Sequence, residues 1–294
     1  MTNPLVSIVC ITYNHEPYLC QALDGFLMQR TTFPVEIILA EDCSTDGTRA
    51  ICEEYAKRYP GKIRYIWSET NVGAVANERR AMEAAQGKYI AFCEGDDYWT
   101  DADKLQRQVD FMESHPDYSV CWHRCKHLLV ENGDMHEDQC AEILPDGAEG
   151  IDIDLNLYFS HWYTQPLTMV FRSDCLDLDY MLCYKYYRDT HQIYHLLKNG
   201  KGYLFAFEGG VRTVHSGGVA SQRDDKRICD DSLAIAAELY TINRDVYTRN
   251  YYAQVLQWAI YSARRFGYNQ GELSWKLFAL NKDIKQLVKN LIRK

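Results

Sequence analysis

The sequence lacks long hydrophobic runs, an excess of basic charge, internal repeats and low-complexity tracts. No uninterrupted apolar stretch approaches the roughly 18 residues of a membrane-spanning helix, so we expect none. The first residues, MTNPLVS, also lack the basic and apolar segments of a secretory signal, which indicates a cytoplasmic protein. A formal net charge of −9 argues against nucleic acid as a partner, because proteins bind phosphate backbones through basic surfaces.

The cysteine count does not suit a disulfide framework, because eleven is an odd number. We expect reduced thiols that mostly act as small apolar residues. The segment Cys121-Trp-His123-Arg-Cys125-Lys-His127 has the residue types of a zinc site. Alternate residues of a strand fan out along it and cannot all converge on one tetrahedral ion, so we interpret residues 118–130 as a strand.

The first 115 residues alternate short apolar runs with amphipathic segments. Expected strands cover residues 5–11, 35–40, 63–67 and 89–93, and expected helices cover residues 19–27, 48–59, 74–86 and 103–114. We expect the third helix to end at Gly87, since glycine often follows a helix C-terminus. This alternation, with short connections, predicts an α/β fold with a mostly parallel sheet between helices.

Three of the four predicted strands end in polar residues: Thr12-Tyr13-Asn14, Glu41-Asp42 and Glu94-Gly-Asp96-Asp97. In a parallel sheet these ends meet at one edge, where ligands bind. The three carboxylates of the last segment repel one another, and burying them costs several kcal/mol unless a positive charge compensates for them. That segment is therefore either a solvated turn or a cation site, and the meeting of three polar ends favours the cation site.

The second half of the chain is mixed, then helical. Strands are expected near residues 118–130, 167–172 and 203–207, a helix at 189–198, and almost only helix after about residue 230. We predict one domain over residues 1–225, with halves 1–115 and 116–225, and a helical C-terminal extension over 226–294. Residues 283–294 set apolar side chains against several lysines; such a helix packs on its own domain or lies on an anionic membrane surface.

Four segments, in this order and spacing, resemble the family 2 glycosyltransferases, which have the GT-A fold. They are Val6-Ser-Ile-Val-Cys-Ile-Thr-Tyr-Asn14, Glu41-Asp-Cys-Ser-Thr-Asp-Gly-Thr48, Asn71-Val-Gly73 and Gly87-Lys-Tyr-Ile-Ala-Phe-Cys-Glu-Gly-Asp-Asp-Tyr-Trp99. The resemblance covers at least residues 5–125, including Asp103-Lys-Leu105, and extends more weakly to about residue 221. It implies that residues 1–115 bind the nucleotide and residues 116–225 the acceptor.

The resemblance also implies an activity. A sugar moves from a nucleotide-diphosphate sugar, most often a UDP-sugar, to an acceptor hydroxyl with inversion. The acceptor is a glycan or a lipid-linked saccharide, and the pathway is the synthesis of a bacterial polysaccharide, lipopolysaccharide or capsule. Such a protein works in the cytoplasm or peripherally on the inner face of the membrane.

Nucleotide-binding residues follow from the same resemblance. Ile11, Thr12 and Tyr13 correspond to the loop that lies against the base, and Asp42 to the carboxylate that accepts a hydrogen bond from uracil. Many members carry an Arg-Asn pair in the helix after the Asn-x-Gly turn. Here that region reads Asn77-Glu-Arg-Arg80, so the resemblance assigns the diphosphate contact to Arg79 or its neighbour Arg80.

The metal site and the base also follow from the resemblance. Asp96 and Asp97 match the acidic motif that holds ribose and a divalent metal, Mn²⁺ or Mg²⁺, and Glu94 stands where many members have the first aspartate. Asp97 is the expected metal ligand, and His215 is a further ligand, a diphosphate contact or a loop histidine without a ligand. Asp189 corresponds to the catalytic base, although it also suits the N-cap of a helix.

Two other functions remain open at this point. A sugar nucleotidyltransferase usually draws on a basic, glycine-rich phosphate loop near the N-terminus, and residues 12–17, TYNHEP, have neither property. A non-catalytic protein that binds nucleotide-sugars is disfavoured because the acidic segment and Asp189 are intact.

Overall fold

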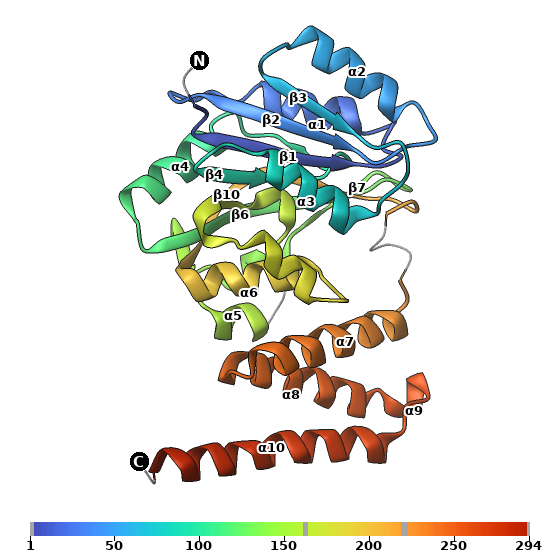
Figure 1. Ribbon diagram of the computed structural model, residues 1–294, viewed down its shortest axis with the longest axis vertical. Helices are drawn as coiled ribbons and strands as arrows, with labels where there is room; N and C mark the ends of the chain where they lie inside the picture. The colour runs from blue at the N-terminus through green and yellow to red at the C-terminus, as the bar shows by residue number, and fades with distance from the viewer. Residues whose placement is uncertain (1–2, 161–163, 219–222, 293–294) are drawn as a thin grey trace. The chain divides into compact units, whose positions relative to one another are not determined.

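The computed structural model describes residues 3–160, 164–218 and 223–292, with side chains to residue 282 (Figure 1). The chain divides into two compact units: Met1–Cys183 with Asp189–Ser216, and Tyr184–Arg188 with Gly217–Lys294. The functional division that the sequence suggests, after residue 225, stays a prediction.

The first unit contains a single mixed sheet and its covering helices. Its first half has β1 (Val6–Thr12), α1 (Leu19–Leu27), β2 (Val35–Glu41), α2 (Thr48–Arg58), β3 (Ile63–Trp67), α3 (Ala74–Ala84), β4 (Tyr89–Phe92), β5 (Tyr98–Trp99) and α4 (Lys104–Ser114). Its second half has β6 (Tyr118–Leu129), β7 (Asp134–Glu137), η1 (Gln139–Glu142), β8 (Gly150–Ile153), α5 (Leu155–Ser160), η2 (Pro166–Thr168), β9 (Val170–Arg172), η3 (Ser173–Cys175), η4 (Leu178–Cys183), α6 (Asp189–Asn199) and β10 (Lys201–Val214).

The strand order in the described sheet is β3-β2-β1-β4-β9-β6-β10-β5, with β7 beside β6 and β8 beside β10. The first four strands are parallel, and Val6 of β1 lies opposite both Val35 and Tyr89. β9 runs antiparallel between β4 and β6, while β6 and β10 are parallel. Figure 1 shows α3 in front of these strands and α1 behind them. The predicted α/β architecture with a mostly parallel sheet is therefore confirmed.

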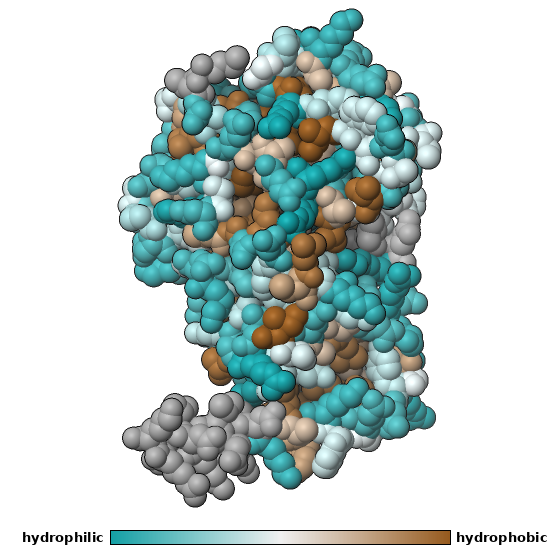
Figure 2. All heavy atoms as spheres, in the orientation of Figure 1, coloured by the Kyte–Doolittle hydropathy of each residue, from teal (hydrophilic) through white to brown (hydrophobic). Residues whose placement is uncertain are grey.

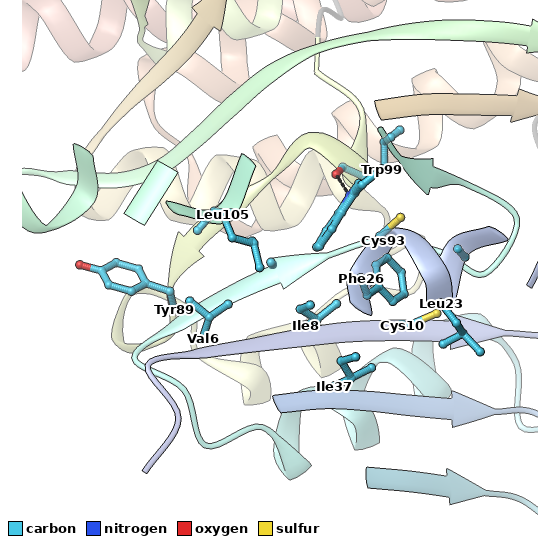
Figure 3. Packing of buried hydrophobic residues seen from close by; sticks show 14 of the residues in the cluster. Val6, Ile8, Cys10, Leu23, Phe26, Ile37, Tyr89, Cys93, Trp99 and Leu105 are labelled. Atoms are coloured by element: carbon cyan, nitrogen blue, oxygen red, sulfur yellow. Dashed lines mark hydrogen bonds between the residues drawn. The ribbon is translucent and has the colours of Figure 1, made fainter. Parts of the chain in front are cut away.

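The main core lies between the sheet and the helices behind it. Figure 3 shows part of this cluster: Val6, Ile8, Cys10, Leu23, Phe26, Ile37, Tyr89, Cys93, Trp99 and Leu105. The rings of Phe26 and Trp99 meet edge to face with centroids 4.8 Å apart, a favoured aromatic geometry. The indole N–H of Trp99 donates to the Leu167 carbonyl at 2.8 Å. Trp99 thereby anchors the chain directly after the acidic segment.

The elements predicted before residue 115 are present, whereas the later prediction is incomplete. The predicted strand at residues 203–207 extends over Lys201–Val214 as β10, and the short strands β5, β7 and β8 were not predicted. Glycine weakens a strand locally, and β10 contains Gly202, Gly209 and Gly210. Pairing with β5, β6 and β8 stabilises β10 in spite of its composition.

The cysteine-rich segment is the strand that the sequence predicts, namely β6. All eleven cysteines are free thiols, and seven are buried: Cys10, Cys52, Cys93, Cys121, Cys125, Cys140 and Cys229. The side-chain amide of Gln108, on α4, donates to the sulfur of Cys121 in β6 at 3.6 Å. Most cysteines therefore act as small interior residues.

The second unit is helical, as predicted, with α7 (Asp225–Asn243), α8 (Val246–Tyr261), α9 (Ala263–Phe266) and α10 (Gln270–Ile292). Asp224 caps α7 by accepting the Arg227 N–H at 2.8 Å, and Asp245 caps α8 by accepting the Thr248 N–H at 2.9 Å. The helices pack through a small apolar cluster, whose buried members are Cys229, Leu256, Ala259, Leu273 and Leu280.

The face of the molecule in Figure 2 is largely hydrophilic. Figure 2 shows teal residues over most of the visible face and apolar residues in separate groups. No helix in the described part of the chain combines the length and hydropathy that crossing a bilayer requires. The side chains of residues 283–294 lie outside the described part, so their packing or membrane contact stays a prediction.

The predicted end of the third helix at Gly87 is wrong, since α3 ends at Ala84. Gly87 is needed for a close approach to β1 instead. Its N–H donates to the Ser7 hydroxyl at 2.8 Å, and a Cβ at this position would lie 2.5 Å from the Ser7 nitrogen and 2.8 Å from the Val6 carbonyl carbon. Backbone atoms cannot move away as the end of a flexible side chain can.

We therefore expect Gly87→Ala to lower the free energy of unfolding by about 1–3 kcal/mol, the usual cost of overpacking. Gly271→Ala is the matched control, because a Cβ there meets no atom closer than 3.4 Å and alanine favours the helix. Urea titration of both variants tests this. Equal midpoints for Gly87→Ala and the wild type would contradict the close-approach argument.

Candidate active site

The carboxyl ends of β1, β2 and β4 lie side by side, as predicted. Thr12 at the end of β1 is opposite Glu41 of β2, and the Asp42 N–H donates to the Thr12 carbonyl at 3.1 Å. On the other side of β1, the Gly95 N–H donates to the Ile11 carbonyl at 3.0 Å. The three polar segments therefore meet at one edge of the sheet, where α/β proteins bind ligands.

Hydrogen bonds join the loops that follow β1 and β2. The Asn14 side chain accepts the Thr45 N–H at 2.8 Å, and the Asn14 N–H donates to the Ser44 hydroxyl at 3.0 Å. Asn14 has φ 55°, a left-handed conformation that asparagine tolerates better than most residues. The His15 N–H donates to the Thr48 hydroxyl at 2.8 Å. These bonds hold both loops in a defined arrangement before any ligand binds.

The four residues assigned to contact with the nucleotide base differ in how far their side chains are exposed. Ile11 and Thr12 are buried and belong to β1 rather than to a loop, whereas the Tyr13 side chain is 42% exposed. The carboxylate of Asp42 accepts the N–H groups of Val72 and Gly73 at 2.8 and 2.9 Å, which ties it to the turn before α3. Of these side chains, Tyr13 is therefore the one best exposed for stacking on a base.

The acidic segment is joined to the far end of the sheet by Asp97. Directly after it, Tyr98 and Trp99 form β5 and pair with Val211 and Gly210 of β10. The buried Asp97 carboxylate accepts the Thr213 N–H at 2.7 Å. Burial, followed by the charges of Asp96 and Glu94, raises the pKa of Asp97 well above its usual range. Burial and the neighbouring carboxylates therefore outweigh the positive charge that reaches Asp97.

Two imidazole side chains lie beside the Asp96 carboxylate. One carboxylate oxygen lies 3.1 Å from His215 Nε2 and 3.7 Å from His15 Nε2. Burial alone raises the pKa of Asp96, but the hydrogen bond to His215 and the charge of His15 outweigh it and lower the pKa. The other oxygen of Asp96, Oδ1, is buried and has no partner among the described residues. The structure thus brings Asp96 and His215 together, and a role of His215 in metal binding stays a prediction.

Three further carboxylates come from three different elements. Glu94 follows β4, Glu78 lies on α3, and Asp189 is the first residue of α6. Burial and the charges of Asp96 and Asp189 raise the pKa of Glu94 to about 8. Burial and the charges of Glu94 and Asp189 likewise raise the pKa of Glu78 to about 8. Asp189 accepts the Thr190 N–H at 2.9 Å and is close enough to act on both.

The arginine near these carboxylates is Arg212. Its charge lowers the pKa values of Glu94 and Asp97, although burial keeps both raised. Arg79, the arginine that the sequence favours, pairs instead with Glu83 and Asp179 at 2.8 Å. The structure does not bring Arg79 together with the acidic segment, and its contact with a diphosphate stays a prediction.

Glu78, His15 and Arg212 were missed as site residues. Arg212 lies three residues before His215, and Glu78 adjoins Arg79, so both lay close in sequence to residues that had been singled out. His15 lies in the loop after β1. The sequence gives no signal for the contact of His15 with Asp96, because their side chains meet only across neighbouring strand ends.

The residue types at this site fit a hard divalent cation. Mg²⁺ and Mn²⁺ take oxygen ligands, often one or two carboxylates with phosphates and water. Buried carboxylates with raised pKa values, together with the unpartnered Asp96 Oδ1, are what a site of this kind presents. No three His, Cys, Asp or Glu side chains of the described residues are arranged to hold a metal by themselves. A cation here would therefore share its ligands with phosphate oxygens or water.

Comparison with known protein families identifies the chain. The model of glycosyl transferase family 2 matches residues 7–175, which is more than half of the sequence. The chain belongs to glycosyl transferase family 2. The matched region includes the strand ends, the acidic segment and Glu78, and it ends before Asp189 and β10. The family resemblance of the sequence is thereby confirmed.

Curated relatives match over less than half of the chain. An uncharacterized protein of Mycobacterium tuberculosis is 52% identical over 128 residues, 44% of this chain and 37% of that protein. The putative teichuronic acid biosynthesis glycosyltransferase TuaG of Bacillus subtilis is 41% identical over 114 residues, 38% of this chain and 44% of TuaG. The match thus spans less than half the length of either relative.

Solved structures share the fold over nearly the whole chain. TarS of S. aureus in complex with UDP-GlcNAc has a TM-score of 0.63 at 20% identity, over 89% of this chain and 74% of that chain. The mannosyltransferase PcManGT of Pyrobaculum calidifontis, in complex with GDP-Man and Mn²⁺, has a TM-score of 0.58 at 16% identity, over 100% of this chain and 89% of that chain. At such identities the likeness shows the fold alone, and the expected GT-A architecture is confirmed.

The charge of Glu78 leads to a prediction about stability. The pKa of Glu78 is raised to about 8 in the folded state, whereas an unfolded glutamate titrates near 4.3. Between these values the unfolded chain releases the proton first, so stability falls as pH rises from about 4 to 8. Glu78→Gln removes this effect. Because the side chain is only half-buried, we expect a gain on the order of 1 kcal/mol at pH 8 and almost none at pH 4.5.

Thermal unfolding in the presence of a chelator, at pH 4.5, 6 and 8, measures this difference. A gain of about 1 kcal/mol corresponds to roughly 2–4 °C in a domain of this size. Glu54→Gln on the exposed face of α2 is the control, and it should change nothing at any pH. A Glu78→Gln shift that is equal at all three pH values would contradict the electrostatic explanation.

Proposed function

We propose that this protein is a metal-dependent, inverting glycosyltransferase that uses a nucleotide-diphosphate sugar, with UDP-sugars as the preferred donors. The observation that carries the proposal is the acidic segment: Glu94, Asp96 and Asp97 lie at the carboxyl edge of the sheet, beside the loops that follow β1 and β2. The complexes of TarS with UDP-GlcNAc and of PcManGT with GDP-Man and Mn²⁺ support a donor of this class.

In the proposed mechanism, Asp42 and Tyr13 position the base, and Asp96 and Glu94 contact the ribose. Asp97 and His215 would hold Mn²⁺ or Mg²⁺, which would neutralise charge on the diphosphate leaving group. Arg212, whose charge acts on Glu94 and Asp97, would add positive charge to the same site. The hydrogen bond from the Thr213 N–H would keep Asp97 oriented.

Asp189 is the proposed base. Inversion requires proton removal from the acceptor on the face opposite the leaving group. Asp189 lies at the N-terminus of α6, where the helix dipole favours an ionised carboxylate, and its charge reaches Glu78 and Glu94. We propose a glycan or lipid-linked saccharide as acceptor, in bacterial surface polysaccharide synthesis, because TuaG is named for such a pathway. The free cysteines support the expected cytoplasmic location.

The donor class is tested first by thermal shift with UDP, GDP, CDP and TDP, each with Mn²⁺, Mg²⁺ or a chelator. A ligand at a hundredfold excess over its Kd stabilises the folded state by about 2.7 kcal/mol. We expect the largest shift with UDP and metal, and a smaller one with chelator. A larger shift with another diphosphate would contradict the UDP assignment. No shift with any of them would favour a protein without this donor site.

Two substitutions separate the metal site from the base. Asp97→Asn keeps an acceptor for the Thr213 N–H but removes charge, so we expect transfer to fall at least about a hundredfold and the metal-dependent UDP shift to shrink. Asp189→Asn should also lower transfer at least about a hundredfold but leave the UDP shift unchanged. Asp110→Asn, on the exposed face of α4, is the control. Wild-type turnover in either site variant would remove that residue from the mechanism.

A further inference from the structure

In the second unit, one face of α10 leaves two large aromatic side chains exposed. Leu273, Leu277 and Leu280 of α10 pack into the apolar cluster of this unit. Trp275 and Phe278 lie between them in sequence and therefore point to the other side of the helix. They are 65% and 48% exposed, and their ring centroids are 5.6 Å apart. Two large aromatic side chains that lie together on one exposed face form a larger apolar surface than a single exposed residue.

This face, which we call the aromatic face of α10, consists of Trp275, Phe278 and Lys282. The Lys282 ammonium lies 4.8 Å from the centre of the Phe278 ring, and the Lys282 side chain is exposed. An apolar ring body beside a lysine head is the arrangement that suits the boundary between lipid tails and headgroups. Tryptophan is enriched at that boundary.

The charge of the chain is divided unevenly. Residues 263–294 contain eight Lys and Arg and two Asp and Glu, a net charge of +6, within a chain of net charge −9. A basic segment in an acidic protein attracts an anionic partner to that segment alone. A second copy of the chain, related by twofold symmetry, would instead bring two such basic segments together, which is unfavourable.

We propose that the aromatic face of α10 binds an anionic lipid surface, with Trp275 and Phe278 entering the headgroup region and Lys282 contacting anionic headgroups. The binding is peripheral and depends on both apolar area and charge. It is independent of the glycosyltransferase mechanism, because none of the three residues belongs to the proposed active site.

The test is co-flotation of the full chain with vesicles of phosphatidylcholine alone or with about one-third phosphatidylglycerol. We expect binding to the anionic vesicles, weaker binding at high salt, and little binding to phosphatidylcholine. The double variant Trp275→Ser, Phe278→Ser should lower the partition coefficient at least about tenfold, and Lys282→Glu should lower it further. Trp275→Phe should keep most of the binding.

Tyr186→Ser is the matched control, because Tyr186 is also an exposed aromatic residue (43%) next to a lysine, with Lys185 5.2 Å from its ring. It should bind like the wild type. Undiminished vesicle binding by the double variant would overturn the proposal. Failure of the wild type to bind anionic vesicles would also overturn it. In that case, a dimer in sedimentation that the double variant dissociates would point to a second copy of the chain as the partner, and binding of an RNA oligonucleotide would point to a nucleic acid. Nucleotide-induced thermal shifts, measured in parallel, report on the active site independently.

Discussion

The hydrogen bond from the Thr213 N–H to the Asp97 carboxylate joins two parts of the first unit that are 116 residues apart. It depends on the pairing of β5 with β10, because β5 comes directly after the acidic segment in the sequence. Trp99 secures the same corner, because its ring packs on Phe26 and its N–H reaches Leu167. Without this corner, Arg212 and His215 would have no fixed position relative to Asp96 and Asp97, and the site would lose one of its sides.

Negative charge accumulates at this site from elements that are far apart in the sequence. Glu78, Glu94 and Asp97 all have raised pKa values, first because folding removes water from around them and then because carboxylates face one another. Buried like charges are costly when no cation neutralises them. A folded protein that keeps such a cluster gives up stability there. This is the expected condition of a site whose ligands carry the missing positive charge.

The two units have different physical characters. The first is a broad α/β core with a polar edge that is fixed by backbone hydrogen bonds. The second is a small helical unit with a limited apolar cluster and exposed aromatic residues on α10. A chemical site requires geometry held to fractions of an ångström, whereas a lipid surface requires only area and charge. The hydrogen-bonded polar edge of the first unit and the exposed aromatic residues of the second agree with this difference.

Local patterns were enough to predict the first half of the sheet and the meeting of Thr12, Asp42 and the acidic segment at one edge. Apolar runs, helical spacing and short polar loops act over a few residues, and parallel strands leave little freedom in how they assemble. The end of α3, the length of β10 and the partners of the acidic segment followed no local rule. Gly87 is set by its approach to Ser7, and the proximity of Glu78, Asp189 and Arg212 to Glu94 depends on strand pairing and helix packing across the whole unit. Only the tertiary structure decided these, because side chains on separate elements meet only after the backbone has folded.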